Sequence, residues 1–189
     1  MQETTLKKRY IFKLLANFIS AIIGAILVAI VPKALGPVAY GQFIYLQEFF
    51  IKFIGFLDMG SSIAFFTKLS AKQSRKELIS FYFLFSLLIF VLLFLFILLG
   101  YYFEFLSVFV PDIPIFYIFL GLFFGFFTWF TQVYTKIADA YALTVSYEII
   151  KIFHKIITLF LLLFFIYYLS FDLELYFYFN YISLVSFLL

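Results

Sequence analysis

The sequence predicts an all-α fold: a polytopic transmembrane helix bundle of about six spans, with a cytoplasmic N-terminus. Hydrophobic residues make up 67% of the 189-residue chain and charged residues 12%, and the chain contains 33 Phe and 15 Tyr. A soluble domain is about 45–50% apolar and about 25% charged, so this chain lacks the polar surface of a water-soluble globule. Because the long apolar runs do not alternate with period 2, they favour helices over a β-barrel.

Sequence features bound several of the expected spans. Pro32 ends the first span, and the turn residues Gly36 and Pro37 follow it. The second span ends at Leu57 or continues past Asp58 to Phe66. The third has no charge from Ile79 through Phe103, and Pro114 opens the fourth as a favourable first-turn residue. The expected spans are 10–31, 40–57 or 40–66, 78–103, 114–134, 152–169 and an incomplete 175–189.

The basic residues predict the orientation of these spans. Eleven of the thirteen lysine and arginine residues lie at alternate span ends, which places them on one side of the membrane. Lys33 lies on the opposite side, and Lys52 lies inside the second span. We therefore expect residues 1–189 to form a single transmembrane domain with its N-terminus in the cytoplasm. The eleven residues are Lys7, Lys8, Arg9, Lys13, Lys68, Lys72, Arg75, Lys76, Lys136, Lys151 and Lys155.

The second span carries the main candidate site. At about 100° per residue, Tyr45, Glu48, Lys52 and Gly55 fall within an arc of about 80° on one helix face. At a rise of about 1.5 Å per residue, Lys52 lies roughly 18 Å along the span from Tyr40, near the middle of the membrane. Charged side chains are costly at that depth, so we expect this face to meet other helices or a water-filled cavity.

Two interpretations of this face remain open. In the functional one it forms the wall of a polar cavity, where Lys52 meets an anionic head group such as a pyrophosphate. In the structural one, Glu48 and Lys52 neutralise each other at i,i+4 spacing and pack the span against a neighbour. Asp58 lies farther along, beside Gly60, and is expected to mark a helix end or hinge rather than to contact substrate.

Polar and small residues form two further patterns. Gln132 belongs to a polar stripe at i, i+3, i+4 spacing on the fourth span, which either lines the same cavity or joins helices through hydrogen bonds. Small residues recur on the first and fourth spans, where we expect close helix contacts within the chain, with dimerisation as the alternative. The polar stripe is Thr128, Thr131, Gln132, Thr135 and Asp139; the small residues are Ala21, Ala25 and Ala29, then Gly121 and Gly125.

Signals for enzymes, metals and cofactors are absent from the sequence. There is no cysteine and one histidine, and no nucleophile motif, Gly-rich phosphate loop or H-E-x-x-H is present. Asp139 and Glu148 are isolated in the sequence, and His154 is expected at a membrane interface. The basic cluster from Lys68 to Lys76, which includes Ser74, is expected to lie on the anionic inner leaflet rather than on nucleic acid.

Three sequence segments resemble one family of membrane proteins. LKKRYIFKLLANFIS, VPKALGPVAYGQF and FLDMGSSIAFFTKLSAK look like the N-terminal part of a polysaccharide biosynthesis flippase. This is the O-antigen flippase type within the multidrug/oligosaccharidyl-lipid/polysaccharide exporter superfamily. The resemblance is sharp over the first 76 residues and looser beyond them. The matching residues are Leu35, Gly36, Pro37, Tyr40, Gly41, Asp58 and Gly60.

The resemblance implies a function and a location. It implies a multi-pass protein of the bacterial inner membrane that moves an undecaprenyl-pyrophosphate-linked oligosaccharide outward by alternating access, for lipopolysaccharide or other surface polysaccharide. Cationic cavity residues would then meet the pyrophosphate or acidic sugars, and Lys52 has the depth for this contact. Gly36, Pro37, Gly41, Asp58 and Gly60 would hold structural or hinge positions. The expected partners are membrane lipid and the lipid-linked oligosaccharide.

Length separates the chain from this family. Such transporters resemble two six-helix lobes around a central cavity, and 189 residues supply one lobe. We therefore expect either a truncated chain or one that pairs with a second lobe or a second copy. The alternatives are a cation-coupled drug exporter of the same superfamily and a non-transporting membrane subunit or inactive remnant. The exporter needs an available membrane carboxylate, whereas Glu48 already has Lys52 beside it.

Overall fold

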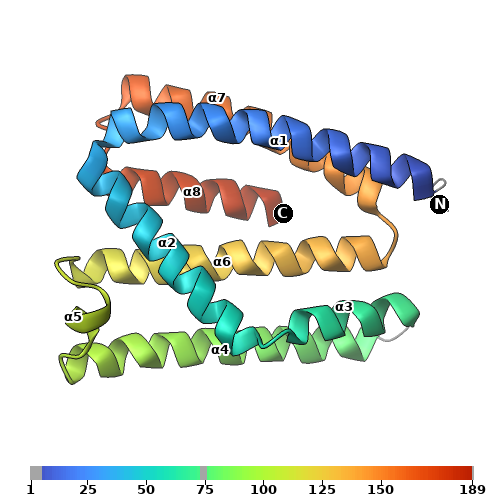
Figure 1. Ribbon diagram of the computed structural model, residues 1–189, viewed down its shortest axis with the longest axis horizontal. Coiled ribbons are helices and arrows are strands. Elements are labelled where there is room, and N and C mark those ends of the chain that lie inside the picture. Colours follow the sequence, from blue (N-terminus) through green and yellow to red (C-terminus); the bar gives the residue numbers. More distant parts are fainter. Residues whose placement is uncertain (1–5, 73–75, 189) are drawn as a thin grey trace. The chain divides into compact units, whose positions relative to one another are not determined.

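The computed structural model describes residues 6–72 and 76–188, and these residues form helices with no strand among them (Figure 1). This confirms the all-α polytopic class. Ser74 and Arg75, which the sequence places in the basic cluster, lie outside the described residues. The helices are α1 (Leu6–Leu35), α2 (Pro37–Asp58), α3 (Ser61–Ala71), α4 (Lys76–Tyr102), α5 (Leu106–Phe109), α6 (Ile115–Ala140), α7 (Thr144–Tyr168) and α8 (Leu173–Leu188).

Four of the described helices, α1, α4, α6 and α7, are long and apolar enough to cross a membrane. Joined as one broken span, α2 and α3 make a fifth, with a bend of 60° between them. Helix α8 has 16 residues, fewer than the roughly 20 that a perpendicular span needs. The chain is therefore a membrane protein with four or five candidate spans, and the sixth span and the orientation remain predictions.

The first helix does not end at Val31 as the sequence suggested. Pro32 lies inside α1, which continues to Leu35. Proline has no amide to donate, yet its carbonyl still accepts a hydrogen bond from the Gly36 amide at 3.0 Å, which closes the last helical turn. Gly36 has a φ of 80°, in the left-handed region that favours glycine, and α2 begins at the next residue, Pro37.

The expected loop at residues 135–151 is largely helical, which corrects the bounds of the fourth and fifth spans. Helix α6 continues to Ala140, α7 begins at Thr144, and only a short turn separates them. The charged residues of this stretch are unfavourable in lipid. They are accommodated in helices because Lys13 pairs with Asp139 at 2.7 Å and Lys151 pairs with Glu148 at 3.2 Å.

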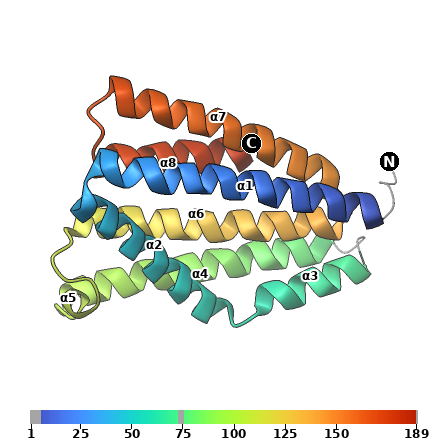
Figure 2. The same ribbon diagram turned by 45° about the horizontal axis from the view of Figure 1, so that its top comes forward.

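The chain divides into two compact units. One takes in the residues up to Gly41 and those from Thr135 onward, and the other is Gln42–Tyr134. In the first unit α1 runs along α7, and α8 returns beside α7 (Figure 2). In the second unit the core is rich in aromatic rings: Phe65 stacks on Tyr82 with ring centroids 4.4 Å apart, and Phe90 packs against Phe126 at 4.9 Å.

The small residues of α1 do not make the expected contacts within the chain. Ala21, Ala25 and Ala29 are all exposed, so that prediction is wrong. Helix α1 is buried through other residues, including Ile23 and Val31. Two residues along a helix turn it by about 200°, so Ile23 points almost opposite to Ala21. The repeat of small residues therefore identified a helix face, but not the face that packs inside this chain.

Candidate functional site

Helix α2 has one buried face and one polar, exposed face. The buried face packs in the second unit through apolar side chains at three- and four-residue spacing, and Asp58 closes the series. Side chains at that spacing share one side of a helix. The buried residues are Phe43, Leu46, Phe50, Ile54 and Asp58.

Two glycines of α6 allow this buried face to pack closely. A Cβ atom added to Gly121 would lie 2.8 Å from Leu46 Cβ, and one added to Gly125 would lie 2.6 Å from Phe50 Cβ. Any larger residue at either position would clash. The expectation of close contacts at Gly121 and Gly125 within the chain is therefore confirmed, and these contacts fix the rotation of α2 about its own axis.

That rotation exposes the four residues that the sequence grouped on one face. Tyr45, Glu48, Lys52 and Gly55, which we call the α2 polar face, are all exposed. Lys52 Nζ lies 3.5 Å from Glu48 Oε2, and their side chains are 77% and 52% exposed. The structure thus brings the acid and the base together, in the middle of a candidate span.

The ion pair cannot by itself make this face suitable for lipid. A Glu–Lys pair at i,i+4 stabilises a helix by about 0.2–0.5 kcal/mol. Placing a lysine at the centre of a membrane helix costs about 2.5–3.5 kcal/mol on insertion scales. The separation of 3.5 Å is also longer than the roughly 2.7–2.9 Å of a good charge-assisted hydrogen bond. The α2 polar face therefore suits water, an ionic ligand or another polar surface.

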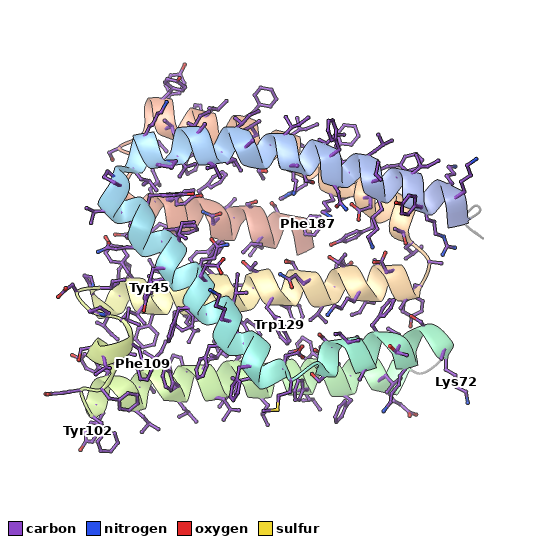
Figure 3. The ribbon with its side chains drawn as sticks, viewed as in Figure 1. Tyr45, Lys72, Tyr102, Phe109, Trp129 and Phe187 are labelled. Atoms are coloured by element: carbon purple, nitrogen blue, oxygen red, sulfur yellow. The ribbon has the colours of Figure 1, made fainter. Side chains whose placement is uncertain are left out.

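Tyr45 is tied to its own unit. Its hydroxyl donates a hydrogen bond to the backbone carbonyl of Phe109, the last residue of the short helix α5 (both are labelled in Figure 3). Its ring stacks on Phe49 with centroids 6.3 Å apart. One end of the α2 polar face is thus anchored within the second unit, while Glu48 and Lys52 have only each other as ionic partners among the described residues.

Asp58 organises the bend between α2 and α3. It is the last residue of α2, and its carboxylate accepts hydrogen bonds from Ser61 Oγ at 2.5 Å, Ser62 Oγ at 2.7 Å and the Ser62 amide at 3.1 Å. The Tyr82 hydroxyl of α4 donates a fourth at 2.9 Å. Gly60, with a φ of 78°, is the residue just before α3 and forms its N-cap. Asp58 is 7% exposed and so stabilises the start of α3 from a buried position.

Gln132 of the polar stripe on α6 is exposed, and no hydrogen bond links it to Tyr45, Glu48 or Lys52 of the α2 polar face within the described part of the chain. Thr131 Oγ1 donates to the Thr128 carbonyl of the same helix at 2.7 Å. The role of Gln132 in binding substrate therefore stays a prediction.

The first unit contains two ion pairs whose acids look isolated in the sequence. Asp139 and Glu148 look isolated along the chain, but Lys13 of α1 bonds to Asp139 Oδ2 at 2.7 Å, and Thr144 Oγ1 donates to Asp139 Oδ1 at 2.9 Å. Glu148 is 1% exposed and pairs with Lys151 of the same helix. The i,i+3 spacing of Glu148 and Lys151 was visible in the sequence, whereas nothing local connects Lys13 to Asp139.

Metal chemistry has no candidate site in the described residues, where no group of three or more His, Cys, Asp or Glu side chains gathers. His154 Nε2 instead lies 2.9 Å from Ser186 Oγ of α8. No family model, curated protein or solved structure matches the chain in comparisons with known proteins.

Proposed function

We propose that this chain is a membrane transporter of the flippase type, which moves a lipid-linked oligosaccharide outward across the bacterial inner membrane for surface polysaccharide. The observation that carries the proposal is Lys52, a 77% exposed lysine in the candidate span that α2 and α3 form together, with Glu48 as its ionic partner at 3.5 Å. An exposed cation at this depth is costly unless it serves a ligand or a pathway. The resemblance of the first 76 residues to polysaccharide flippases supplies the substrate class.

In this proposal Lys52 binds the anionic head group of the carrier lipid. Its ammonium has three donors, and a pyrophosphate offers a stronger partner than the Glu48 carboxylate at 3.5 Å. After the head group leaves, Lys52 forms its ion pair with Glu48 again. The lysine is therefore neutralised both with and without bound substrate. The apolar lipid tail stays in the bilayer while the head group follows the α2 polar face.

Cation-coupled drug export has less support. Such coupling needs a carboxylate that is available to a cation, and four carboxylates in α2, α6 and α7 already have partners. Glu48, Asp139 and Glu148 pair with lysines, and Asp58 accepts four hydrogen bonds from serine and tyrosine groups. No described residue favours this second function over the first.

The test is transport by the purified chain in liposomes that contain a short-chain polyprenyl pyrophosphate with a fluorescent oligosaccharide. A membrane-impermeant quencher measures how fast the labelled sugar changes leaflet. Lys52→Gln should lower the initial rate at least about tenfold, because a lost charge-assisted hydrogen bond is worth about 1.5–3 kcal/mol. Lys52→Arg should retain most of the rate.

Lys33→Gln is the matched control, since Lys33 is an exposed lysine near the end of α1 and has no proposed role in binding. Its rate should equal that of the unmodified chain. No transport above protein-free liposomes, or an unchanged rate for Lys52→Gln, would overturn the proposal. Uptake of a cationic dye without movement of the lipid would favour the drug exporter, and movement of neither would favour a non-transporting subunit.

A further inference from the structure

We infer that the α2 polar face docks against the same face of a second copy of this chain, with the two α2 helices crossing at Gly55. The inference rests on the proposed function in that the second copy supplies the opposing wall of the path along Lys52. Three observations carry it. Packing within the chain does not explain Gly55, the residues of the α2 polar face have the spacing of a helix-packing seam, and the charges of that face are complementary to those of a second copy.

Gly55 is not explained by packing inside the chain. A glycine inside a helix costs about 1 kcal/mol relative to alanine, so it is normally kept where another group approaches closely. Gly121 and Gly125 have that reason, since an added Cβ would lie within 3 Å of Leu46 or Phe50. A Cβ added to Gly55 would meet nothing within 4 Å. The close approach that Gly55 permits is thus available to a helix from outside.

The α2 polar face has the spacing of a helix-packing seam. Tyr45, Glu48, Lys52 and Gly55 follow one another at intervals of three, four and three residues, and all four are exposed. This is the a/d spacing by which two helices pack along their length. In membranes, small residues at such a seam let two backbones approach closely.

The charges of the face are complementary to themselves. The basic residues at alternate span ends predict one orientation for every copy, so two copies are related by a two-fold axis along the membrane normal. A two-fold axis places the same patch on both sides of an interface. Lys52 lies about 6 Å along the helix from Glu48, within reach of Glu48 of the partner subunit. By symmetry, Glu48 then pairs with Lys52 of the partner subunit. All four charged side chains are thus shielded from lipid at the interface.

Tyr45 limits how far the two helices stay in contact. Its hydroxyl is already bonded to the Phe109 carbonyl of its own chain. The contact is therefore centred on Gly55, and the helices separate toward Tyr45. Glu48 and Lys52 of both copies line the opening between them, where an anionic head group displaces a carboxylate from the lysine. The second copy thus completes a site of which one chain supplies half.

Single-cysteine crosslinking tests the contact, because the chain has no cysteine of its own. Gly55→Cys in liposomes should form a disulfide-linked dimer on mild oxidation, since a disulfide needs Cα atoms about 4.4–6.8 Å apart. The matched control is Leu88→Cys on α4, which is also exposed in a candidate span and should give at least fivefold less dimer. Equal crosslinking at the two positions, or none at Gly55→Cys, would overturn the inference.

Charge reversal tests the complementarity. In the Gly55→Cys background, Glu48→Lys should reduce the dimer at least fivefold, because each face then carries two lysines. The exchange Glu48→Lys with Lys52→Glu should restore it and also controls for folding. Crosslinking that ignores both changes contradicts the reciprocal pairs. Retained crosslinking without lipid transport would sink the proposed function and leave the docking intact, whereas transport without crosslinking would do the reverse.

Discussion

The Tyr82 hydroxyl on α4 donates a hydrogen bond of 2.9 Å to Asp58 Oδ1, and this bond joins α4 to the bend between α2 and α3. Both residues are buried, at 3% and 7% exposure. A carboxylate in that position has no described cation beside it and depends on four hydrogen-bond donors. The bend is therefore held by polar contacts that apolar packing cannot replace.

Tyr82→Phe should destabilise the protein by about 1.5–3 kcal/mol, because it removes a hydrogen bond to a charged group and leaves the ring in place. Thermal unfolding in detergent, followed by loss of helical circular dichroism, measures the change. The matched control is Tyr102→Phe, whose hydroxyl belongs to a 78% exposed residue and should matter little. Equal unfolding temperatures for the two variants would show that the bond to Asp58 contributes nothing.

Gly125→Ala should destabilise the second unit by about 1–3 kcal/mol, as overpacking of a core does. The added Cβ would lie 2.6 Å from Phe50 Cβ, so α2 or α6 must shift. In the detergent-solubilised monomer, Gly55→Ala meets open space and should be neutral or stabilising by up to about 1 kcal/mol. Unfolding of the two variants side by side checks the contrast, and a Gly125→Ala protein as stable as the unmodified chain would refute the close packing.

The two ion pairs should differ in strength. A double-mutant cycle on Lys13 and Asp139, with Gln and Asn replacements, should give a coupling free energy of about 1 kcal/mol, since the pair is partly buried at 2.7 Å. The same cycle on Glu48 and Lys52 in the monomer should give about 0.2–0.5 kcal/mol. Added salt should weaken the second pair more than the first. A larger coupling free energy for Glu48 and Lys52 than for Lys13 and Asp139 would contradict the distances and burial of the two pairs.

Lys151→Met should destabilise the protein by about 3 kcal/mol, because it leaves the Glu148 carboxylate buried at 1% exposure without its partner. The double variant Glu148→Gln with Lys151→Met should recover most of that loss, since the uncompensated charge is then gone. Denaturant unfolding in mixed micelles provides the measurement. A double variant that is less stable than Lys151→Met alone would show that the unpaired Glu148 charge does not cause the loss of stability.

The helices could be predicted because long apolar runs in lipid leave the backbone few alternatives. The predicted ends of the helices were wrong where side chains that are far apart in the sequence contact each other. Asp139 looked isolated because Lys13 cannot be recognised as its partner from local spacing. Only some of the hydrogen-bond partners of Asp58 could be found from the sequence. Ser61 and Ser62 lie within one helical turn of it in sequence, whereas Tyr82 is reached only through the fold.

The α2 polar face could be placed in advance because helical periodicity fixes which residues share a side. Periodicity does not say which side faces the protein. The same argument that grouped Glu48 with Lys52 also grouped Ala21, Ala25 and Ala29, and those alanines turned out to be exposed. What decides between faces is the shape of the neighbouring helix, and for α2 that is the space beside Gly121 and Gly125.

The ion pair between Lys13 and Asp139 also implies an order of events during synthesis. The two residues are 126 positions apart, so α1 enters the membrane long before its partner carboxylate has been made. During that interval Lys13 is one of the basic residues from which a cytoplasmic N-terminus is predicted. Once α6 has been inserted, Asp139 neutralises Lys13. One lysine thus belongs first to the predicted orientation signal of α1 and later to the contact between α1 and α6.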